Sequence, residues 1–170
     1  MNNDIFNSKI SELTNIISGR ISVHINDFFG NITDIELPNV NSYITGELIN
    51  RKFQCNAYVF YTEFFLDKKD ISVLLYINKH IADNLNHNSK CFFDEISDDI
   101  KFILCEILKI FAENDNFNLK KYTFNCDFLE SFFNNEVQKR TKDKDNFDYI
   151  FNNIFLREEK TDFGGILVFF

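Results

Sequence analysis

The sequence predicts an α+β fold in which long helices pack on one mostly antiparallel sheet. Residues 4–29 and 97–114 carry apolar side chains at the three- and four-residue intervals of an amphipathic helix. Both stretches are followed by segments rich in aromatic and β-branched residues, which are typical of strands. At 170 residues the chain fits a single domain, residues 1–170.

The first helix is predicted over residues 4–29, with one buried stripe. The stripe consists of Phe6, Ile10, Leu13, Ile17, Ile21, Ile25 and Phe28. Gly30 is expected to end the helix, because glycine readily adopts the left-handed conformation common just past a helix C-terminus. A short strand is predicted at residues 33–37, closed by Pro38, the one proline of the chain.

A hairpin is predicted next, with strands at residues 53–66 and 71–77 joined by a charged turn. A short helix follows at 78–86, before the second long helix. The chain ends in another strand pair, at 147–156 and 165–170. We expect the apolar terminal strand either at an exposed edge, covered across a two-fold axis in a dimer, or inside the chain's own sheet. Residues 43–50 and 116–145 give no consistent pattern.

The order of helix, strands and hairpin occurs twice, which indicates an internal duplication. A shift of about 94 residues places Glu12 on Glu106 and Phe53 on Phe147. We therefore predict a pseudo-two-fold fold with repeats at about 4–87 and 95–170. The second repeat has no counterpart of the short helix at 78–86.

Composition excludes several function classes. A net charge of −8 argues against nucleic-acid binding, which needs clustered cations. The basic run at residues 138–144 is interrupted by acid and is interpreted as a solvated loop. The four cysteines and three histidines lack the spacing of metal ligands, so no cofactor of the chain's own is expected. With no signal peptide and no apolar run of bilayer length, a cytoplasmic location without membrane contact is expected.

Ser8, Glu12 and Asn15 lie at i, i+4 and i+7 beside the apolar stripe, so they share one helical face. On this spacing alone, a solvated polar face is the simpler interpretation. Pro38 follows Asn15 after twenty-two intervening residues, and Gly19 completes an Asn-Ile-x-x-Gly continuation. This four-position pattern resembles that of the CheC/CheX/FliY family of response-regulator phosphatases.

The resemblance implies a CheC-like fold and a protein aspartyl-phosphate phosphatase. The first helix would dock on a phosphorylated CheY-like receiver domain, where Asn15 orients the attacking water. Glu12 would pair with the receiver's invariant lysine, and Ser8 would assist at the edge of the site. Mg²⁺ is expected on the receiver and not on this chain. The resemblance also allows a CheD-like partner and a homodimer.

The second copy of the motif is degenerate. Glu106 is retained, but Phe102 replaces the acidic or hydroxyl residue, Lys109 replaces asparagine and Phe132 replaces proline. An ammonium group has no acceptor with which to orient water as an amide does. One active site per chain is therefore predicted, and Glu106 is interpreted as a helix residue paired with Lys109.

Two other interpretations stay open. A non-catalytic receiver-binding or flagellar-switch adaptor on the same fold would keep the docking surface without the chemistry, just as the second motif has lost its site. An unrelated α+β protein would require the spacing to Pro38 and the repeat to be coincidences.

Overall fold

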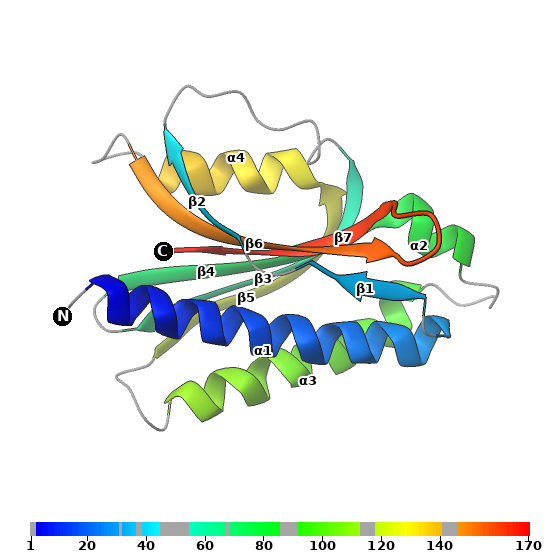
Figure 1. Cartoon of the computed structure of the whole chain (residues 1–170), viewed down its shortest axis with the longest axis horizontal. Helices are drawn as coiled ribbons and strands as arrows, with labels where there is room; N and C mark the ends of the chain where they lie inside the picture. Colours follow the sequence, from blue (N-terminus) through cyan, green and yellow to red (C-terminus); the bar gives the residue numbers. More distant parts are fainter. Residues whose placement is uncertain are drawn as a thin grey trace.

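The computed structural model describes residues 3–30, 32–36, 39–44, 55–66, 69–85, 92–112, 118–140 and 146–170. A seven-stranded sheet lies at the centre of the molecule. Helices α1 (Asn3–Phe29) and α3 (Phe92–Ala112) cover one face, and α4 (Leu129–Arg140) covers the other (Figure 1). The short helix α2 (Lys79–Leu85) lies at one end of the sheet. This arrangement confirms the predicted α+β class.

The sheet is built from antiparallel pairs in the order β1-β6-β7-β4-β3-β5, and β2 also pairs with β6. Its strands are β1 (Thr33–Ile35), β2 (Asn39–Ile44), β3 (Asn56–Leu66), β4 (Lys69–Asn78), β5 (Asn118–Phe128), β6 (Asn146–Leu156) and β7 (Asp162–Phe169). The C-terminal strand β7 lies between β6 and β4 and is buried from Phe163 to Phe169. Of the two expected placements, the chain's own sheet is therefore the one observed.

The predicted helices and hairpins are present, and most of their ends lie within three residues of the expected positions. Helix α3 differs, because it begins at Phe92, several residues before the expected start. Strands β2 and β5 and helix α4 were not predicted. β5 and α4 lie within the unpatterned region 116–145, whereas only the end of β2 reaches the region 43–50.

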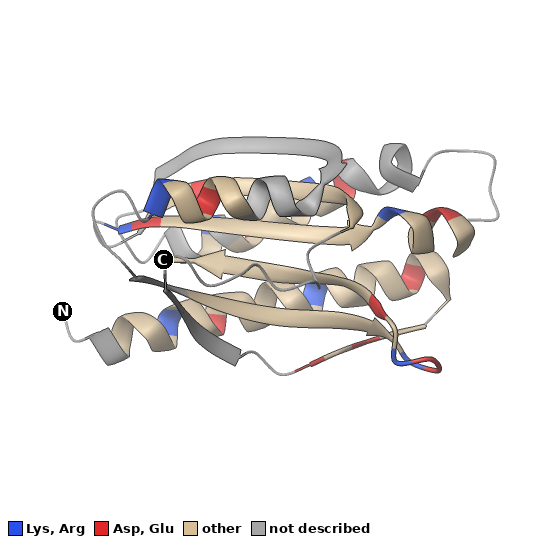
Figure 2. Ribbon diagram, turned by 90° about the horizontal axis from the view of Figure 1, so that it is seen from above, with Lys and Arg blue, Asp and Glu red and all other residues tan. Residues whose placement is uncertain are grey.

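The basic run at residues 138–144 was predicted to be a solvated loop, and for Gln138–Arg140 this is wrong. These residues form the end of α4, where a basic last turn follows an acidic position (Figure 2). Arg140 is half-buried and donates from Nε to Oε2 of the buried Glu136, 3.1 Å away. Residues 141–144 lie outside the described residues.

The core between the sheet and the helix layer is filled mainly by α1, α3 and the central strands. The predicted stripe of α1 is at most 2 % exposed from Phe6 to Ile25, and Phe28 is half-buried. Helix α3 buries Ile100, Leu104 and Ile107 in the same core. Because both helices bury one face on the sheet, their opposite faces form a common outer surface.

Polar contacts fix the rotation of α1 about its own axis. Asn152 on β6 donates from Nδ2 to Ser18 Oγ, 2.6 Å away, in the buried contact between helix and sheet. Near the end of the helix, the Asn26 side chain makes three hydrogen bonds with Thr33 of β1, at 2.7–3.1 Å. Gly30 follows with a φ of 90° and ends the helix as predicted. The outward face of α1 is therefore set by the sheet.

The two hairpins, β3–β4 and β6–β7, lie side by side because β4 pairs with β7. Helices α1 and α3 lie next to each other on the same face of the sheet (Figure 1). The duplication, with repeats at about 4–87 and 95–170, stays a prediction.

Candidate functional site

The three predicted site residues lie on the solvent face of α1. Ser8, Glu12 and Asn15 are all exposed, whereas Ile10 and Leu13 between them are fully buried against the sheet. At 1.5 Å per residue, the row extends about 10 Å along the helix axis. The structure therefore places the hydroxyl, the carboxylate and the amide on one exposed ridge, as their spacing predicted.

None of these three side chains has a hydrogen bond or ion pair within the described part of the chain. In particular, Ser8 is not bonded to a base that would activate its hydroxyl as a nucleophile. The ridge is also convex, whereas small-molecule sites are concave and enclose their ligands. Pro38, the fourth position of the motif, lies outside the described residues.

The degenerate second motif lies on α3, next to α1. Phe102 is 61 % exposed and Lys109 is also exposed. Glu106 was expected to pair with Lys109, and this is wrong. Its Oε2 atom lies 3.7 Å from Nη1 of Arg20 on α1, so the carboxylate is directed across to the neighbouring helix. The side chain of Phe132 lies outside the described residues.

A second polar contact joins the two helices and defines their relative direction. His24 Nε2 lies 3.4 Å from Asp99 Oδ2. From Arg20 to His24 the residue number rises on α1, while from Glu106 to Asp99 it falls on α3. The helices are therefore antiparallel neighbours.

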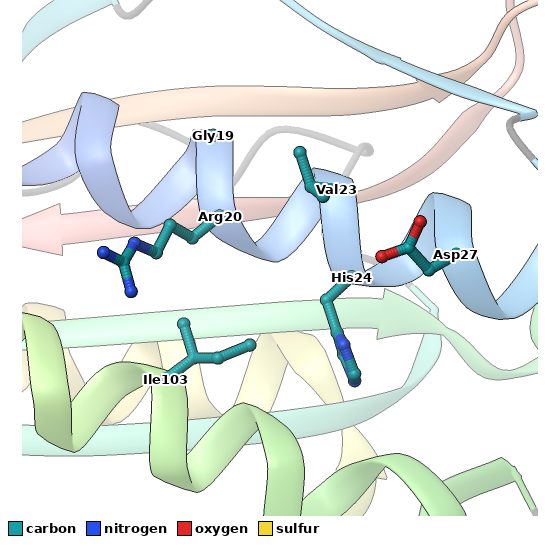
Figure 3. Close-up of a pocket in the computed structure, with 6 residues that line it drawn as sticks. All are labelled: Gly19, Arg20, Val23, His24, Asp27 and Ile103. Carbon is teal, nitrogen blue, oxygen red and sulfur yellow. The ribbon is translucent and has the colours of Figure 1, made fainter.

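A shallow groove of about 410 Å³ runs between α1 and α3, and it is lined by Gly19, Arg20, Val23, His24, Asp27 and Ile103. Arg20 and His24 extend from α1 toward α3, and Ile103 points back toward α1 (Figure 3). Gly19 leaves open space, because a Cβ atom added there meets nothing within 4 Å. The groove opens on the same outer surface as the ridge of Ser8, Glu12 and Asn15.

The large hydrophobic residues that are exposed in the described part of the chain all lie on these two helices. They are Ile5, Ile16 and Val23 on α1 and Phe102 and Ile110 on α3, each 37–61 % exposed. Sequence reasoning missed them as a surface. The sequence did carry an indication of this surface, because Ile5, Ile16 and Val23 fall outside the periodic stripe that α1 buries.

A polar cluster on the opposite face of the sheet was also missed. The Tyr61 hydroxyl is in hydrogen-bond contact with the carboxylates of Glu63 and Glu136. Burial, together with the charge of Glu136, raises the pKa of Tyr61 far above its usual range, so the phenol stays protonated. Arg140 adds a 2.9 Å bond from Nη2 to Ser72 Oγ. The cluster holds α4 on the sheet, away from the ridge.

The described residues hold no group of three His, Cys, Asp or Glu side chains placed to bind a metal ion. Among them there is also no helix long and apolar enough to cross a membrane.

No family model matches the sequence, and no curated protein matches it. Solved structures of flagellar switch proteins do match its fold. FliM in the FliG–FliM complex from H. pylori is 12 % identical, with 95 % of this chain and 90 % of that chain covered and a TM-score of 0.51. FliY from Thermotoga maritima is also 12 % identical, with 95 % and 87 % covered and a TM-score of 0.50.

The class that this fold defines is the CheC-like α+β fold of FliM and FliY. At 12 % identity the similarity concerns the fold and not the activity. The expected CheC-like architecture is therefore confirmed, and the interpretation as an unrelated α+β architecture is not supported.

Proposed function

We propose that this chain is a phosphatase for the phosphoaspartate of a CheY-like receiver domain, in chemotaxis or another two-component pathway. The observation that supports this most is the ridge on α1. Ser8, Glu12 and Asn15 are exposed in a row and are not used in bonds within the described part of the chain. A helix ridge of this shape fits into a partner's concave active site, and phosphoryl transfer there needs positioning more than covalent chemistry.

In the proposed complex, the Asn15 carboxamide reaches the phosphoryl group and orients the attacking water. An amide can both donate to and accept from that water without ionising. Glu12, one turn before it, pairs with the receiver's lysine and anchors the helix. Ser8 contacts the edge of the site. The receiver supplies the Mg²⁺ ion that neutralises charge on the phosphoryl oxygens, so this chain needs no metal of its own.

A dephosphorylation assay tests the proposal. Receivers from the same genome are phosphorylated with a small phosphodonor, and loss of the phosphoaspartate is followed with and without this chain. Wild type is expected to accelerate the loss for at least one receiver. Asn15→Ala is expected to lower kcat by about 10²-fold, because water is no longer positioned, with little change in KM. Glu12→Ala is expected to raise KM as well.

Asn135→Ala is a matched control, because Asn135 is an exposed helical asparagine on α4, on the far face of the sheet. It is expected to behave as wild type. A chain that leaves every receiver's own dephosphorylation rate unchanged, or an Asn15→Ala variant with full activity, would contradict a phosphatase.

The second candidate is a non-catalytic receiver-binding or flagellar-switch adaptor. It is favoured by the fold shared with FliM and FliY, and by a second motif that has already lost its site residues. An adaptor would bind a receiver without accelerating dephosphorylation, and Asn15→Ala would leave that binding intact. A homodimer and a CheD-like partner remain proposals within either function.

A further inference from the structure

The exposed apolar side chains of the helix layer are placed on both sides of the groove between α1 and α3. Ile16 and Val23 lie on the α1 side, and Phe102 and Ile110 lie on the α3 side. We refer to these four residues as the helix-layer patch. Isolated exposed hydrophobics are common, but a set confined to one surface marks an interaction site.

The helix-layer patch is continuous with the ridge of the proposed active site. Ile16 lies one turn after Glu12 of the ridge and is itself 37 % exposed. Arg20 lies opposite Glu106, and the two helices are antiparallel. The residues one turn before Arg20 on α1 therefore lie opposite the residues one turn after Glu106 on α3. This places Lys109 and Ile110 of α3 across from Ile16. Val23 and Phe102 continue the same surface in the other direction.

A docked domain needs more surface than the ridge offers. Standard interfaces bury about 800 Å² on each partner, a patch roughly 16 Å in radius if it is drawn as a disc. Along the axis, Phe102 lies about 14 Å from Asn15, and neighbouring helices are about 8–10 Å apart. Together these give about 16–17 Å between Asn15 and Phe102, so a receiver centred on Asn15 covers Lys109 and Ile110 and meets Phe102 at its edge.

The charge of α3 also favours a phosphorylated receiver as the partner. Lys109, at the position where the motif has asparagine, is exposed at the end of the patch next to the ridge. Its ammonium complements a partner whose docking site carries a phosphoaspartate. Glu106, which would repel that site, is instead paired with Arg20.

We propose that α3 forms the second half of the receiver-docking surface, with Phe102 as its apolar anchor and Lys109 as its cation. This rests on the proposed function of α1. The second motif would then have changed from a catalytic site into a binding site, since a hydroxyl position became a phenylalanine and the amide position a cation. Phe102 determines affinity and partner choice here, and it is not a catalytic residue.

The test compares Phe102→Ser and Lys109→Ala with wild type, using the receiver that the wild-type chain dephosphorylates most rapidly. Phe102→Ser is expected to raise KM about ten-fold, a loss of about 1.4 kcal/mol, and to leave kcat within two-fold. A loss above 1 kcal/mol is reached by fewer than about 30 % of interface residues, so it marks Phe102 as a contributing contact. Lys109→Ala is expected to raise KM by a smaller factor that shrinks as salt is added. Gln138→Ser on α4 is the matched control, because it introduces the same residue at an exposed position on the opposite face.

Because Phe102 is 61 % exposed, its replacement is expected to leave the thermal unfolding midpoint unchanged, and this is measured for each variant. If wild type is active and Phe102→Ser keeps the wild-type KM, docking by α3 is wrong and the phosphatase stands. If no receiver is dephosphorylated by wild type, the proposed function itself fails. Light scattering measures the oligomeric state of both proteins. If wild type is a dimer and Phe102→Ser is a monomer, the helix-layer patch binds a second copy of the chain and the inference is overturned.

Discussion

Replacement of Gly164 by alanine is expected to destabilise the centre of the sheet. Gly164 lies in β7, opposite Ile77 of β4. A Cβ atom added at Gly164 would lie 2.4 Å from the backbone oxygen of Tyr76 and 3.3 Å from the Cα of Ile77. A backbone carbonyl cannot rotate out of the way as a side chain does. Strands β4 and β7 must therefore move apart, or their backbone must distort at this position.

Overpacking of this kind costs about 1–3 kcal/mol. For a domain of 150–250 residues, each 1 kcal/mol shifts Tm by about 2–4 °C. Gly164→Ala is therefore expected to lower Tm by roughly 2–12 °C. Gly19→Ala is the internal control, because a Cβ atom there meets nothing within 4 Å on the exposed face of α1. Removing a helical glycine stabilises by about 0.5–1 kcal/mol, so its Tm is expected to rise by roughly 1–4 °C.

Thermal unfolding followed by circular dichroism at 222 nm, supported by urea titration, measures both variants against wild type. Opposite signs for the same chemical change are the expected result. The reasoning fails if Gly164→Ala unfolds at the wild-type temperature, or if the two variants shift in the same direction by similar amounts.

Two further predictions concern polar contacts. Tyr61→Phe removes the hydroxyl that contacts the buried Glu136 carboxylate, and it is expected to lower the free energy of unfolding by about 1–3 kcal/mol. Urea unfolding should show a lower midpoint with an unchanged m-value, and an unaltered midpoint would contradict the role of the cluster. The Arg157 guanidinium, hydrogen-bonded to Asp34 at 3.0 and 3.1 Å, holds the pKa of that carboxyl below its usual 3.8. A lowered folded-state pKa means that the pair stabilises the fold above pH 3.8 and loses this effect as pH falls through the folded-state pKa. NMR titration is expected to show the Asp34 pKa rising toward 3.8 in Arg157→Gln, whereas an identical titration curve in both proteins would refute the pairing.

Features that depend on neighbours along the chain were predicted well. The stripe of α1, its end at Gly30 and the exposed face of Ser8, Glu12 and Asn15 all follow from the helical repeat, which repeats every 3.6 residues and is visible in any short stretch. The same holds for the two hairpins, because each joins strands that are adjacent in the sequence.

Helix α4 shows where this kind of inference ends. Its sequence has weak apolar periodicity, and its last residues form a basic run that suggests solvent. Its packing on the sheet includes the contact of Glu136 with Tyr61, which lies 75 residues earlier in the chain. A buried carboxylate is tolerated only when donors surround it, and those donors come from β3 and from α4 itself.

The face that α1 turns to solvent could thus be derived from a local pattern, because burial of one helical stripe leaves only one direction outward. The surface that lies beside that face could not be derived from the sequence. The antiparallel approach of α3, the pairing of Glu106 with Arg20 in place of Lys109, and the groove between Val23 and Ile103 all come from residues about 80 positions apart. Such contacts depend on how the whole sheet is assembled, with β7 inserted between β4 and β6, and no short-range pattern carries that order.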